Sequence, residues 1–135
     1  TTYYSDSSVV RIMLQAPKQL EFENKDREFK EGIYLEFYEP DGSLSSNLRA
    51  NYCYYYAGED KWRALGNVVV KNIANKEQLD TEELFWVPDD EIVYTNKFVR
   101  IETEGEIIMG EGLEAKQDFS WWTLEEMRGT IYLDE

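Results

Sequence analysis

The sequence contains no histidine and only one cysteine, Cys53. Histidine is the usual general base in catalysis and the commonest metal ligand, so its absence argues against catalytic triads and most metal sites. A lone cysteine cannot form an internal disulfide, and the position of Cys53 between two tyrosines indicates a sheet residue rather than a reactive thiol. The Gly-x-Ser-x-Gly, Gly-rich phosphate-binding and Cys-x-x-Cys motifs are also missing. We therefore expect neither an enzyme nor a cofactor.

Basic residues are scarce: 14 Lys and Arg stand against 28 Asp and Glu, which gives a net charge of −14. A nucleic-acid-binding protein needs a basic surface, so this class is excluded. Carboxylate pairs such as Glu82-Glu83 and Asp89-Asp90 are adjacent in the sequence and, on a strand, would point to opposite faces, unlike the facing pair of a glycosidase. An anionic ligand would have to be held by apolar contacts or by a few local cations.

No apolar run approaches the roughly 18 residues that span a bilayer, and no signal peptide is visible. The chain opens at Thr1-Thr2 without methionine, so we interpret its start as that of a trimmed or processed form. The length of 135 residues predicts a single domain over residues 1–135.

Aromatic residues are abundant: they make up 15% of the chain, with 10 Tyr, 6 Phe and 4 Trp. Apolar residues recur at every second position in several short segments, as in Val10–Ala16, Ile33–Phe37 and Leu48–Tyr56. Turn signals such as Pro40-Asp41-Gly42 and Gly58-Glu59-Asp60 separate these segments. This pattern predicts an all-β antiparallel sandwich or barrel.

Two segments fit this pattern less well, because they are rich in helix-forming residues. We expect a strand for Glu77–Trp86. For Thr123–Arg128 we expect a turn or a single helical turn, because Thr123 and Glu126 fit a capping box.

A weak internal repeat also runs through the chain. Similar strand starts occur at Gly32, Gly66, Lys97 and Gly129, which are separated by 34, 31 and 32 residues. Each unit has a second strand and then a third aromatic or aliphatic cluster. A period of this length predicts supersecondary units that stack on their neighbours, although chance self-similarity is the alternative.

These residues resemble the LptC family within the LptA/LptC and OstA-like periplasmic lipopolysaccharide transport proteins. The resemblance is carried by Gly66-Asn67-Val68-Val69-Val70, by Leu79-Asp80-Thr81-Glu82-Glu83-Leu84 and by Ile92-Val93-Tyr94-Thr95. They match the family's "G-x-V", "T-x-x-L" and "I-Y-T" strands, and the similarity extends from about Tyr4 to Trp122. One departure is that no glycine follows the "I-Y" strand, near Thr95-Asn96. In relatives a glycine at this place is important for docking to the transporter, so this contact is not carried over.

The resemblance implies a twisted, partly open β-jelly roll of stacked antiparallel strands (OstA-like) with an apolar interior. It implies a periplasmic component of the lipopolysaccharide export bridge, attached to the inner membrane by an N-terminal anchor that is absent from this chain. Such a protein takes lipopolysaccharide, through its lipid A acyl chains, from an LptB/LptF/LptG-type ABC transporter. It then passes the lipid to an LptA-type jelly-roll protein in outer-membrane biogenesis. Metal, cofactor and nucleic acid have no part in this role.

The residues assigned to the lipid follow from the alternation. We expect the lipid-binding interior to comprise Ile12, Leu14, Leu35, Phe37, Leu48, Ala50, Tyr52, Val68, Val70, Val99, Ile101, Leu113, Ala115 and Phe119. An ordinary packed core is the competing interpretation of the same residues. The first strand, around Val10–Ala16, and the last, around Gly129–Leu133, are the expected partner-docking edges, with Val10, Ile12, Gly129, Ile131 and Leu133 as their residues.

The rival hypothesis is a non-catalytic carbohydrate-binding β-sandwich. Its stacking platform would use exposed rings drawn from Tyr52, Tyr54, Tyr55, Tyr56, Trp62, Trp86, Trp121 and Trp122. The direction of these rings separates the two hypotheses, because a sugar-binding surface needs them exposed.

Overall fold

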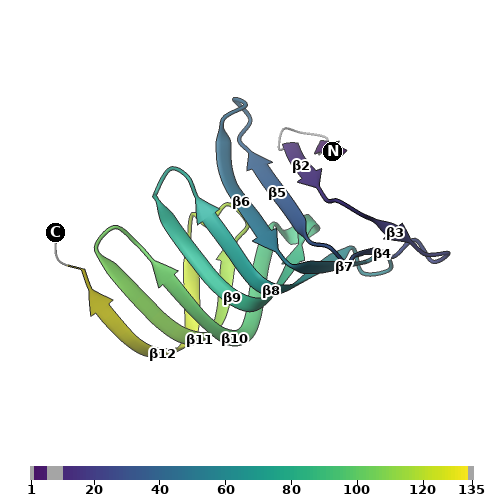
Figure 1. Ribbon diagram of the computed structural model, residues 1–135. Coiled ribbons are helices and arrows are strands. Elements are labelled where there is room, and N and C mark those ends of the chain that lie inside the picture. The colour runs from purple at the N-terminus through teal and green to yellow at the C-terminus, as the bar shows by residue number, and fades with distance from the viewer. Residues whose placement is uncertain (1, 6–10, 134–135) are drawn as a thin grey trace.

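The computed structural model describes residues 2–5 and 11–133, and the fold of this part is all-β (Figure 1). One antiparallel sheet contains the strands, and a single 3-10 turn, η1 (Pro88–Asp90), joins two of them. The strands of the described part are β1 (Thr2–Ser5), β2 (Arg11–Gln15), β3 (Leu20–Glu21), β4 (Arg27–Phe29), β5 (Ile33–Tyr38), β6 (Leu44–Ala50), β7 (Tyr52–Tyr56), β8 (Lys61–Asn72), β9 (Glu77–Val87), β10 (Ile92–Glu102), β11 (Glu106–Lys116) and β12 (Trp122–Tyr132).

The sheet divides at β8 into two layers. Residues 61–65 of β8 pair with β7, which leads on to β4 and β3, whereas residues 69–72 pair with β6, which leads on to β5, β2 and β1. Strands β9 to β12 continue both layers, because each is long enough to turn the corner between them. We call the layer with β7 the first layer and the layer with β6 the second layer. Figure 1 shows β8 to β12 as nested curves whose two arms enclose the interior.

Local irregularities produce the corner between the layers. In β8, Gly66 and Asn67 have φ angles of +80° and +46°, and the register with β9 shifts between Leu65 and Val68. β10 has a register shift between Thr95 and Phe98 against β11. Bulges of this kind bend a strand and increase its twist, so a continuous strand can serve two layers.

The predicted repeat is confirmed as a structural unit. Its starts at Gly66, Lys97 and Gly129 all lie within long strands, near the corner where each chain segment enters the second layer. The second strand of each unit returns through the second layer, as Leu48, Leu79 and Ile108 do in β6, β9 and β11. Each period of 31–34 residues therefore adds two strands to each layer of this part of the roll.

Several element predictions are confirmed and two are wrong. The strand expected at Glu77–Trp86 is β9, and the turns at Pro40-Asp41-Gly42 and Gly58-Glu59-Asp60 join strands as expected. Thr123–Arg128 is not a turn but part of β12, because pairing with β11 along Glu106–Ala115 outweighs the local capping signal. The segment at Val10–Ala16 is not the first strand: β1 precedes β2 and pairs with it.

Candidate functional site

The second layer carries a line of aliphatic side chains that crosses the sheet from strand to strand. Each member is the register partner of the next, and every member is buried with at most 7% of its surface exposed. We call this line the aliphatic ladder: Leu14, Leu35, Leu48, Val70, Leu79, Ile101 and Ile108. Strands lie about 4.8 Å apart, so the ladder extends over about 29 Å at right angles to the strands.

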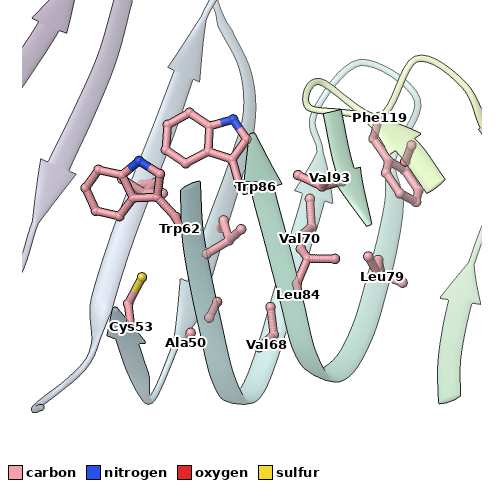
Figure 2. Close-up of a cluster of buried hydrophobic side chains, with 14 of the residues drawn as sticks. Ala50, Cys53, Trp62, Val68, Val70, Leu79, Leu84, Trp86, Val93 and Phe119 are labelled. Carbon is pink, nitrogen blue, oxygen red and sulfur yellow. The ribbon is translucent and has the colours of Figure 1, made fainter. Parts of the chain in front are cut away.

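The first layer faces this ladder with aromatic rings at both ends of a second line and two smaller residues between them. Its members are also register partners of one another: Tyr55, Trp62, Trp86, Val93, Ala115 and Trp122. The Trp62 and Trp86 rings, both labelled in Figure 2, lie 5.5 Å apart. Phe37 of the second layer contacts Trp86 edge-on at 5.2 Å. The two layers thus share one apolar interior.

The structure buries nearly all of the predicted interior residues in this space. Leu14, Leu35, Phe37, Leu48, Ala50, Val68, Val70, Val99, Ile101, Leu113, Ala115 and Phe119 are buried, and the half-buried Ile12 packs against them. Their burial also fits an ordinary core, so lipid contact at these residues stays a prediction.

The prediction that Tyr52 lines the interior is wrong. The chain bends at the exposed Asn51, and the alternation changes phase there, so Cys53 rather than Tyr52 points inward. The Tyr52 side chain is half-buried instead, and its hydroxyl donates a hydrogen bond to the Glu28 carboxylate. Burial, followed by this hydrogen bond, raises the pKa of Tyr52 above its ordinary value.

Sequence reasoning missed several interior residues that the same alternation could have found. These are Phe29, Ile33, Ala64, Leu79, Leu84, Val93 and Ile108, together with Trp62 and Trp86. Cys53 is also buried, but the change of phase at Asn51 hides it from the alternation. Trp62 and Trp86 are only 6% and 4% exposed, so they cannot serve as sugar-stacking platforms. Of the eight rings named for that rival hypothesis, Trp121 alone is exposed.

Residues 117–121 join β11 to β12 and cross the open side of the interior. Phe119 of this segment is fully buried, and its ring stacks with Trp122 at 6.4 Å. Figure 2 shows Phe119 within the same apolar cluster as Val93 and Leu79. The predicted interior residue Phe119 therefore does not come from a strand.

The C-terminal edge of the sheet is β12, as predicted. Ile131 and Leu133 there are 51% and 38% exposed, and Gly129 is half-buried. At the other end the edge is β1 rather than the strand at Val10–Ala16, so Ile12 lies on a strand that is paired on both sides, and Val10 lies outside the described residues. Docking at either edge stays a prediction.

Within residues 2–5 and 11–133, no group of three or more His, Cys, Asp or Glu side chains could hold a metal ion. The same part of the chain includes no helix with the length and apolar character needed to cross a bilayer. Some of its charged side chains pair across neighbouring strands, as in the ion pair between Arg63 and the buried Glu83, with 2.6 Å between nitrogen and oxygen.

These features define a class of protein: an open antiparallel sheet, bent into a jelly roll around an interior lined by an aliphatic ladder. The sequence matches the family described as "Lipopolysaccharide-assembly, LptC-related" over residues 1–132. The chain belongs to this LptC family, which gives it a role in lipopolysaccharide transport as a component of the periplasmic Lpt machinery. No curated protein sequence matches the chain closely enough to be reported as a relative.

Proposed function

We propose that this domain shelters the acyl chains of lipopolysaccharide between its two layers, without catalysing a reaction. The observation that carries the proposal is the aliphatic ladder, because it runs across the strands towards both edges of the sheet. Saturated chains need apolar contact and little directional bonding, and burial is worth about 0.8 kcal/mol per methylene. A multiply acylated lipid therefore gains much from such a lining.

The two edges suit a protein that works in a series. Edge strands expose unpaired backbone N–H and C=O groups, and another strand can pair with them. We propose that lipid enters from an LptB/LptF/LptG-type inner-membrane transporter and leaves to an LptA-type jelly roll. The domain would be held at the periplasmic side of the inner membrane by an N-terminal anchor. Because the ladder reaches from β2 to β11, edge-to-edge docking would join it to the interior of the neighbour.

Site-specific photo-crosslinking tests the acyl-chain site. A photoreactive amino acid is placed at Ala50 or Val99, which are 4% and 0% exposed, and at the exposed Glu114 on the outer face of β11 as the control. We expect labelled lipopolysaccharide to crosslink at Ala50 and Val99 at least several-fold more than at Glu114. Equal yields at all three positions would contradict the proposal.

A further inference from the structure

The segment 117–121 is tied to both layers of the roll. From the second layer, Ser46 Oγ donates a hydrogen bond to the Gln117 carbonyl at 3.2 Å, and Asn72 Nδ2 donates one to the Asp118 carbonyl at 2.6 Å. Ser46 and Asn72 are both buried. A loop that only had to connect β11 to β12 would need no contact with β6 or β8, which lie across the interior.

Contacts with the first layer fix the other side of this segment. Trp86 Nε1 donates a hydrogen bond to Gln117 Oε1 at 2.9 Å, and the Gln117 backbone N–H donates to the Glu91 carbonyl at 2.9 Å. The Lys116 ammonium lies 2.7 Å from the Glu91 carboxylate. The Lys116 N–H also donates a hydrogen bond to the Trp121 carbonyl at 3.1 Å, so both ends of the segment are fixed. Residues 118–120 are therefore the part that would move once the second-layer bonds are broken.

Phe119 has an unusual backbone for a bulky residue, with φ at +61°. Its N–H donates a hydrogen bond to the Lys116 carbonyl at 2.8 Å. Left-handed backbone in a non-glycine residue is strained and persists when the surroundings impose it. Here the burial of the ring and the bonds of the segment to both layers impose it, so opening the segment would relieve this strain.

We propose that residues 117–121 form a lid over the acyl-chain site, and that the Phe119 ring occupies the space that a saturated acyl chain takes. This inference rests on the proposed function. Phe119 belongs to the same buried cluster as Leu79 and Ile101 of the aliphatic ladder. An entering chain would replace the ring, while the Ser46 and Asn72 hydrogen bonds would break and the freed polar groups of the lid would turn to water.

A reversible covalent lock tests the lid. Asn72 and Asp118 are both replaced by cysteine, because the Asn72 side chain contacts the Asp118 backbone. Cys53 is buried and is kept in every variant. Stopped-flow fluorescence follows the uptake of acyl-labelled lipid A from detergent micelles, before and after reduction with dithiothreitol. We expect the oxidised protein to take up lipid A at least tenfold more slowly than the reduced protein.

A second variant decides the question even if the disulfide does not form. Phe119→Gly removes the ring and tolerates the positive φ, so the lid keeps its backbone but no longer fills the site. We expect uptake at least fivefold faster than in the wild type. Ser120→Ala is the matched control, because this exposed side chain in the same segment has no role in the proposed closure, and its uptake should equal the wild type.

The outcomes separate the two proposals. If lipid A is taken up but neither the lock nor Phe119→Gly changes the rate, the lid is disproved and the acyl-chain site stands. If no variant, including the wild type, takes up lipid A, the proposed function and the lid fall together.

Discussion

At the residue scale, Gly110 shows how tightly β12 packs on β11. A Cβ atom at this position would lie 2.5 Å from the Glu126 carbonyl oxygen and 2.9 Å from a methyl group of Leu124. Glycine at position 110 therefore lets β12 approach β11 closely. Glycine is needed here for close contact between backbones rather than for a special φ angle.

We predict that Gly110→Ala destabilises the domain, because the new methyl group overlaps the backbone of β12. The expected loss is about 1–3 kcal/mol in the free energy of unfolding, as for other overpacking substitutions, measured by urea denaturation. Gly105→Ala is the control, since nothing lies within 4 Å of a Cβ atom there. Equal stability of the two variants would show that β12 does not pack on Gly110 as described.

Cys53 is buried in the first layer, and desolvation raises the pKa of its thiol from 9.0 to about 12. Only the thiolate reacts with disulfide reagents. We predict that the native protein does not react with Ellman's reagent at pH 8, whereas the urea-unfolded protein exposes one reactive thiol. Rapid reaction of the native protein would contradict this burial.

The same shift predicts how stability depends on pH. The folded state holds the thiol proton more tightly than the unfolded state, so the contribution of Cys53 is complete below pH 9 and is lost as the pH rises from about 9 to about 12. Cys53→Ala should therefore lose less stability than the wild type across this interval in urea titrations. Tyr34 and Tyr52, whose pKa values are also raised, contribute equally to both proteins.

At the element scale, β12 is the exposed edge, and the direction of its backbone groups can be assigned. The Leu133 N–H donates to the Gly105 carbonyl, so by strand alternation the Ile131 N–H also points to β11 and the Tyr132 N–H points away. Proline removes an N–H group. The edge therefore offers a matched pair of substitutions.

We predict that Tyr132→Pro weakens binding to an LptA-type jelly roll at least tenfold while the domain stays folded, because only an outward N–H is lost. Ile131→Pro should instead lower the stability of the domain, since it breaks the pairing with β11. Tyr132→Ala controls for the side chain. Calorimetric affinity for the partner, with circular dichroism as the test of folding, measures both effects, and unchanged affinity of Tyr132→Pro would exclude β12 as the docking edge.

The sequence predicts which strand residues are buried better than it predicts the bends and connecting segments between strands. Period-two alternation identified the buried face at Leu35, Leu48 and Val70, since burial follows the pleat directly. It failed at Tyr52, because the bend at Asn51 shifts the phase and no local signal marks such a shift. The burial of Phe119 is predictable from its hydrophobicity. The proposed lid is not, because it depends on Ser46 and Asn72, which are distant in the sequence.

At the scale of the whole molecule, the net charge of −14 opposes an anionic lipid. If apolar burial drives the binding of lipid A, added salt should strengthen binding rather than weaken it. Raising the ionic strength from about 0.01 M to about 1 M shortens the Debye length from about 30 Å to about 3 Å and screens this repulsion.

We therefore predict that the Kd for lipid A falls as salt rises, measured by fluorescence titration. An uncharged lipid with the same acyl chains is the control for the general effect of salt on apolar binding, and lipid A should gain more than this control. A Kd for lipid A that rises with salt would indicate instead a local cationic site for its phosphates.

The repeat of 31–34 residues also allows the length of the roll to change in whole units. One period contributes two neighbouring strands to each layer, and each strand widens the sheet by about 4.8 Å. Duplicating a central period such as residues 66–96 would insert about 10 Å of apolar lining and leave the first and last strands unchanged. A roll of this design can be lengthened in whole modules while the strands at its two ends stay the same.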